Sequence, residues 1–119
     1  MQDQPSKGEE SSDLPVAKDI EELARRLREA EHLEPEVRTE AADLLGDLTA
    51  ALHPPEPQTE ALAQSTAQLV RAVSDQHEPG LIEAAKERLE QAVIKAETKA
   101  PVATDIVLRL IDVLSGIGI

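Results

Sequence analysis

The fold of this chain is decided by the stretch PGLIEAAKERLEQAVIKAETKA, which runs from Pro79 to Ala100 and ends where the next proline, Pro101, begins. Prolines also stand at positions 35 and 57, so four prolines are separated by three equal steps of 22 residues. Proline is tolerated at the first position of a helix and disfavours helix in the residue before it. The sequence therefore predicts helices of nearly equal length, each beginning at a proline.

The apolar residues follow the same 22-residue period. Aligned at this interval, the units share three apolar columns, which are four and three residues apart within each unit, as on one face of a helix. The columns are Ala41, Ala63, Ala85 and Val107; Leu45, Ala67, Leu89 and Ile111; and Leu48, Val70, Ala92 and Leu114. Equal helices folded back and forth explain this period, and so does internal duplication. The sequence leaves both open.

Composition restricts the fold class. The chain has 119 residues, enough for one domain, and contains no aromatic residue and no cysteine. Because the inner faces of sandwiches and barrels normally use β-branched and aromatic residues, an all-β fold is disfavoured. A core of Leu, Ile, Val and Ala suits closely packed helices. The absence of cysteine excludes disulfides and thiolate chemistry.

We expect an all-α fold, an up-down bundle of four to five antiparallel helices with short proline-initiated connections. Residues 1–13 are predicted to be a disordered acidic tail, and residues 14–119 a single domain with helices at about 16–31, 35–52, 57–75, 79–98 and 101–115. The helix at 57–75 has the weakest apolar stripe. The bundle is therefore either an array of five helices or four helices with this one laid across them. A close helix crossing would explain Gly46 inside the second helix.

The chain is strongly acidic, with 24 acidic against 12 basic residues and a net charge of −12. Long-range repulsion disfavours nucleic acid and anionic lipid as partners. The excess of acidic residues is explained if an acidic surface keeps a small protein soluble. The alternative explanation is that the acidic surface binds a basic protein partner. The first residues lack the pattern of a signal peptide, and no stretch is apolar for long enough to cross a bilayer, so we expect a cytoplasmic protein.

The last helix, 101–115, differs from the others because apolar residues cover well over half of its circumference. Its polar residues Asp105, Arg109 and Asp112 lie on one narrow face, where Arg109 can pair with both carboxylates. Such a helix is normally buried on most sides. It could lie at the centre of the bundle, or pack on the bundle with one side and on a second chain with the other. The chain ends in Ile117-Gly118-Ile119, and two terminal isoleucines suggest a docked end. The predicted interaction surface comprises Val107, Leu110, Ile111, Leu114, Ile117 and Ile119.

Residues 89–119 resemble the C-terminal half of a small bacterial family that is classified only as a domain of unknown function. The resemblance is carried by Leu89-Glu90-Gln91-Ala92-Val93, by Pro101, and by Leu114-Ser115-Gly116-Ile117-Gly118-Ile119. The chain departs from the family at Ala96 and Ala100, where the family tends to have an aromatic residue and a histidine. The resemblance implies a small bacterial helical protein and carries no activity.

No residue pattern in the sequence predicts catalysis, a cofactor or a metal site. The histidines, His32, His53 and His77, are expected near helix ends, with His53 at the opposite end of the bundle from the other two. The glutamates Glu83, Glu87 and Glu90 form a charged ridge that is typical of a solvated face. We therefore do not expect an enzyme.

Three functions remain, and they differ in kind. The first is a protein–protein interaction or assembly module, which uses the last helix and the terminal Ile-Gly-Ile for self-association or for binding another protein. The second is a lipid-surface protein, which the absence of interfacial aromatic residues disfavours. The third is an enzyme without a recognisable motif.

Overall fold

The computed structural model describes residues 15–53, 56–75 and 78–116, and within them the chain forms five α-helices and no strand. The helices are α2 (Pro15–Arg28), α3 (Pro35–Ala51), α4 (Pro57–Ser74), α5 (Pro79–Ala96) and α6 (Pro101–Ser115). The predicted all-α bundle is confirmed. The predicted acidic tail at residues 1–13 lies outside the described residues.

Every one of these helices begins at a proline, as the period predicted for the last four. In α3 to α6 the proline occupies the first turn, and the residue before it has non-helical backbone angles. The preceding residues Glu34, Glu56 and Glu78 make no side-chain capping hydrogen bond. Proline thus starts these helices through its backbone restriction, while each acid acts at most through its charge near the positive helix end.

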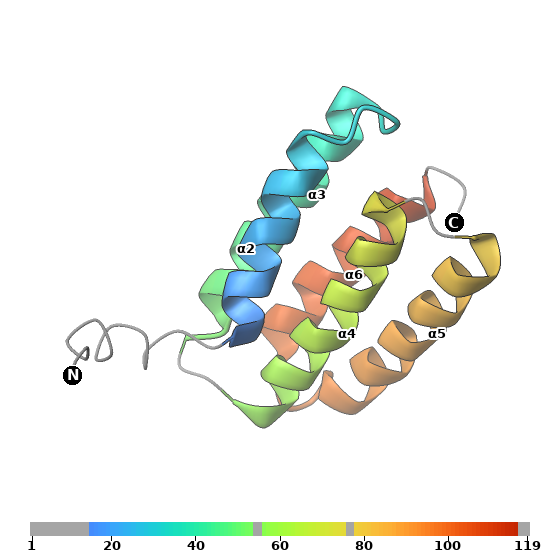
Figure 1. Ribbon diagram of the computed structural model, residues 1–119. Coiled ribbons are helices and arrows are strands. Elements are labelled where there is room, and N and C mark those ends of the chain that lie inside the picture. Colours follow the sequence, from blue (N-terminus) through green and yellow to red (C-terminus); the bar gives the residue numbers. More distant parts are fainter. Residues whose placement is uncertain (1–14, 54–55, 76–77, 117–119) are drawn as a thin grey trace, which may run out of the picture.

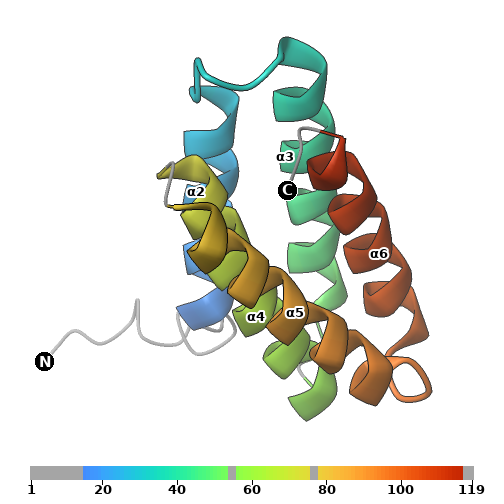
Figure 2. The same cartoon turned by 90° about the vertical axis from the view of Figure 1, so that its right-hand side faces the viewer.

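Consecutive helices run in opposite directions and lie in three layers (Figure 1). The pair α2 and α3 forms one layer, α4 and α6 form the next, and α5 covers the outer side of that second layer. Contacts between α2 and α3, α3 and α6, α6 and α4, and α4 and α2 close a ring of four helices, and α5 packs outside it on α4 and α6 (Figure 2). Of the two expected arrangements, the structure adopts four helices with a fifth outside.

The outer helix is α5, whereas the sequence pointed to residues 57–75. Nine residues of α4 are buried, against four of α5. The polar residue Thr66 weakens the apolar stripe of α4, yet its side chain is fully buried because its hydroxyl donates a 2.8 Å hydrogen bond to the carbonyl oxygen of Leu62. Because its hydroxyl is hydrogen-bonded within its own helix, this threonine can pack in the core as an apolar residue does.

The three apolar columns form the core. Nearly all of their residues are buried, and only Ala92 and Ile111 are partly exposed. Gly46 does not mark a close helix crossing, because it is exposed and no atom of a neighbouring element lies within 4 Å of the position of an added Cβ. The prediction of a close helix crossing at Gly46 is therefore wrong.

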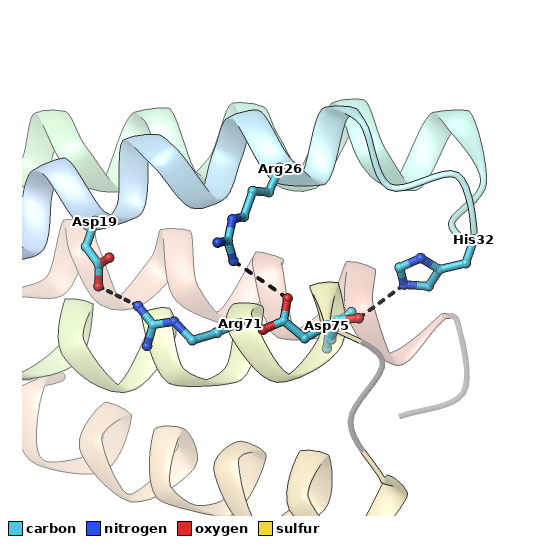
Figure 3. A network of polar contacts seen from close by, with 6 residues as sticks. Asp19, Arg26, His32, Arg71 and Asp75 are labelled. Atoms are coloured by element: carbon cyan, nitrogen blue, oxygen red, sulfur yellow. Dashed lines mark hydrogen bonds and ion pairs between the residues drawn. The ribbon is translucent and has the colours of Figure 1, made fainter.

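Polar contacts join α2 to α4 along one edge of the ring (Figure 3). Arg71 Nη2 lies 2.7 Å from Asp19 Oδ2, and Arg26 Nη1 lies 3.6 Å from Asp75 Oδ1. His32, just beyond α2, places its Nε2 3.1 Å from the carbonyl oxygen of Val73. These contacts bind the two parallel helices at the end where α4 finishes.

Candidate interaction surface

The residues predicted to form an interaction surface lie mainly in the core of this chain. Val107, Leu110 and Leu114 are fully buried, and Ile111 is partly buried. Ile117 and Ile119 lie outside the described residues. Because the buried residues line the side of α6 that packs on the other helices, they cannot contact a second molecule while the bundle is closed. A surface of this chain that contacts a second molecule must therefore consist of other, exposed residues.

Among the described residues, the exposed large apolar side chains all belong to the last two helices. Within the described ranges they are Leu81 and Ile94 on α5 and Val102 and Leu108 on α6, with exposures of 55, 64, 67 and 48 % respectively. Helices α2, α3 and α4 contribute none to this set. Helix α6 thus packs on the bundle with one side and leaves apolar side chains exposed on the other.

Sequence reasoning missed Ile94, although a signal was present. The apolar stripe of α5 continues from Leu89 to Val93 and Ala96, at intervals of four and three residues. Ile94 falls off this stripe and on the side of Glu83, Glu87 and Glu90, all of which are exposed as the sequence predicted. An isoleucine on a charged face is the pattern that could have revealed it.

A groove lies between α4 and α5 and contains two hollows that share Arg88. The larger, of about 520 Å³, lies toward the start of α4, and the smaller, of about 240 Å³, toward its end. The lining of the first hollow is Pro57, Gln58, Ala61, Ser65, Arg88, Gln91, Ala92, Lys95 and Ala96, and that of the second is Gln68, Arg71, Ala72, Leu81, Ala85 and Arg88. We call these residues together the α4–α5 groove.

The lining of the α4–α5 groove contains three cationic side chains and no carboxylate. Arg88 Nη1 lies 3.4 Å from Gln68 Oε1, across the groove. Arg71 already pairs with Asp19 of α2. Lys95 has no carboxylate partner among the residues that the structure describes. The groove therefore offers positive charge above a floor of small side chains.

Other clefts of the described residues have mixed charge. The hollow between α2 and α3, of about 620 Å³, has Glu21 and Glu22 beside Lys18, Arg25 and Arg28. On α6, Arg109 Nε lies 3.5 Å from Asp105 Oδ2, which is one of the two carboxylates expected to pair with it, and both side chains are mostly exposed. Such exposed pairs contribute little to stability.

The described ranges contain no group of three or more His, Cys, Asp or Glu side chains placed to hold a metal ion. His32 is near a helix end as expected, and His77 lies outside these ranges. None of the described helices combines the length and hydrophobicity that a membrane span requires. Among the buried side-chain polar atoms, Arg38 Nε, Ser74 Oγ and Thr104 Oγ1 have no hydrogen-bond partner in the described part of the chain.

Comparison of the chain with protein-family models, with curated proteins and with solved structures finds no match.

Proposed function

We propose that this chain is a protein–protein interaction or assembly module, and that its contact side is the half of the bundle formed by α5 and α6. One observation carries the proposal: the exposed large apolar side chains of the described residues all belong to these two helices. Single exposed apolar residues are common on protein surfaces, and contiguous exposed apolar patches mark interaction sites. The location of all four side chains on two helices that contact each other, with none on α2, α3 or α4, supports α5 and α6 as the contact side.

The proposal keeps the last helix as a contact element and changes its residues. Val102 and Leu108 replace Val107, Leu110 and Leu114, which the bundle itself buries. Ile94 of α5 extends the exposed apolar set beyond the last helix. Contact through these side chains would remove apolar surface from water, and the net charge of −12 keeps the chain soluble without a partner.

The experiment compares the native chain with the triple variant Ile94→Ser, Val102→Ser, Leu108→Ser. Each protein is tagged, expressed in the cells that naturally produce the native chain, and purified under mild conditions that keep bound partners. The oligomeric state of the purified protein is then measured by analytical ultracentrifugation. We expect the native chain to self-associate or to co-purify with a stoichiometric partner, and the triple variant to do neither while retaining its helical circular dichroism.

A matched control replaces two exposed alanines by serine. They are Ala50 on α3, outside the proposed contact side, and Ala84 on α5. This control should assemble like the native chain. A native chain that stays monomeric at high concentration and recovers no partner would contradict the proposal, as would a triple variant that assembles normally.

A further inference from the structure

The α4–α5 groove differs in charge from the rest of this acidic chain. The chain has twice as many acidic as basic residues, 24 against 12, yet no Asp or Glu lines the groove. Its cationic side chains are Arg71, Arg88 and Lys95. Arg71 is already paired with Asp19. Arg88 also lines an adjoining hollow that contains Glu87 and Glu90. Within the groove itself, Arg88 and Lys95 face no carboxylate, so their charge favours a ligand with negative groups at this place.

The walls of the groove have the regular spacing of two helix faces. Along α5 the wall side chains run from Leu81 through Arg88 to Lys95, and along α4 they run from Pro57 to Ala72. The α5 wall spans 14 residue steps, or about 21 Å at a rise of about 1.5 Å per residue. A bound helix of about four turns would fill this length.

Small side chains on the floor favour a helix as the occupant. Ala61, Ser65, Ala92 and Ala96 line the larger hollow, and short side chains let helix axes approach to about 8 Å. Because α5 is the outermost helix, a further helix laid along α4 and α5 would extend the layered packing already present (Figure 1). Larger apolar side chains of that helix could occupy the hollows.

The two cations of α5 determine how far apart the negative groups of a bound helix must be. Arg88 and Lys95 are seven residues apart, so they lie on the same face at a separation of about 10.5 Å along the helix. A helix that carries carboxylates seven residues apart can face both cations at once. The apolar floor requires that the rest of that helix face is apolar.

We propose that the α4–α5 groove binds an acidic amphipathic helix of a partner protein, with its apolar stripe on the small residues and its carboxylates at Arg88 and Lys95. This inference rests on the proposed interaction function and names the chemistry of the partner. Long-range repulsion by the net charge of the chain is screened beyond about 8 Å at physiological ionic strength, whereas the contact pairs form at shorter distances.

The probe is a synthetic helix of 18 residues, about five turns, with Leu and Ala on one face, Glu at intervals of seven beside that face, and one Trp near an end. Because the chain contains no Trp, Tyr or Phe, the peptide provides the only intrinsic aromatic fluorescence in the titration. A second peptide has Gln in place of each Glu. We expect saturable binding of the Glu peptide to the full chain and weaker binding of the Gln peptide.

The test variant is the double charge reversal Arg88→Glu, Lys95→Glu. We expect its Kd for the Glu peptide to rise by about tenfold or more, the combined effect of two exposed ion pairs. Arg71 is kept, since its replacement would also break the pair with Asp19. The matched control is Lys18→Glu, Arg25→Glu in the hollow between α2 and α3, which changes the net charge equally and should leave the Kd within about twofold.

Four results would overturn the proposal, three of them in the peptide titration. Those three are failure of the Glu peptide to bind, equal binding of both peptides, and equal loss of binding in the test and control variants. Self-association of the native chain that Arg88→Glu, Lys95→Glu abolishes would also overturn it, because the groove would then hold a second copy. If the chain assembles through Ile94, Val102 and Leu108 but binds neither peptide, this inference fails and the proposed function stands.

Discussion

Arg71 Nη2 lies 2.7 Å from Asp19 Oδ2, and this ion pair joins residues that are 52 positions apart in the chain. It connects α2 with α4, two parallel neighbours in the ring of four helices. A second ion pair, between Arg26 and Asp75, and the contact of His32 with the carbonyl oxygen of Val73 lie farther along the same edge (Figure 3). The α2–α4 edge is thus held by polar contacts as well as by the apolar core.

Removal of the Arg71–Asp19 pair should lower the free energy of unfolding by a small, measurable amount. Both side chains are nearly half exposed, so solvent screens their attraction, and we expect a coupling energy of up to about 1 kcal/mol. A double-mutant cycle of Arg71→Ala and Asp19→Ala, measured by urea unfolding with far-ultraviolet circular dichroism, gives this energy.

The control cycle uses Arg28 and Asp43, which lie 3.5 Å apart and are more exposed, at 53 and 65 %. Its coupling energy should be close to zero. A coupling energy at Arg28–Asp43 equal to or larger than that at Arg71–Asp19 would contradict this account of the α2–α4 edge.

Two leucines of α6 should respond very differently to truncation. Leu110 is fully buried, so Leu110→Ala should lower the free energy of unfolding by about 2–5 kcal/mol, through lost burial and a cavity. Leu108 is 48 % exposed, and Leu108→Ala should cost less than about 1 kcal/mol. Thermal unfolding of both variants measures the difference. Similar losses at the two positions would refute the placement of α6.

Replacement of Gly46 by alanine should stabilise the protein. Gly46 is exposed inside α3, and an added Cβ would meet no atom within 4 Å. The expected gain is up to about 1 kcal/mol, since glycine is a poor helix former, and the melting temperature should rise by about 4 °C. The control is Gly116→Ala, where the new Cβ would lie 3.2 Å from the carbonyl oxygen of Val113 and the gain should be smaller. A loss of stability in Gly46→Ala would show a contact that the structure lacks.

Two buried threonines should respond in opposite directions to valine. The hydroxyl of Thr104 has no hydrogen-bond partner among the described residues, so Thr104→Val should raise the free energy of unfolding by about 1 kcal/mol. The hydroxyl of Thr66 donates to the carbonyl oxygen of Leu62, so Thr66→Val should lower it by about 0.5–1 kcal/mol. Urea unfolding of both variants tests this, and changes of the same sign would contradict it.

The sequence predicted the helices well because the prolines act locally. The structure begins four helices at the predicted prolines, and the apolar columns at intervals of four and three are buried. The order of the helices in the bundle was predicted less well. A weak stripe suggested that residues 57–75 lie outside. Thr66 was expected on the inner face of this helix, but hydrophobicity counts it as polar, although its hydroxyl is satisfied by the carbonyl oxygen of Leu62.

The candidate site was the least predictable part. Hydrophobicity identified α6 as unusual, but it could not distinguish buried Leu110 from exposed Leu108, because apolar residues cover well over half of the circumference of this helix. The α4–α5 groove joins Ser65 and Gln68 to Arg88 and Lys95 across two helices, and no spacing within either helix indicates which helices become neighbours.

By itself, the sequence determined where the helices begin and which apolar columns they bury, because proline geometry and helical periodicity act over a few residues; it did not determine the exposed side of α6. Only the tertiary structure decided that α5 lies outside the ring, that α2 pairs with α4 through Arg71 and Asp19, and that three cations line one groove. These features depend on the packing of elements far apart in the chain, and this packing depends on side-chain shape and hydrogen bonding that a repeat of 22 residues does not specify.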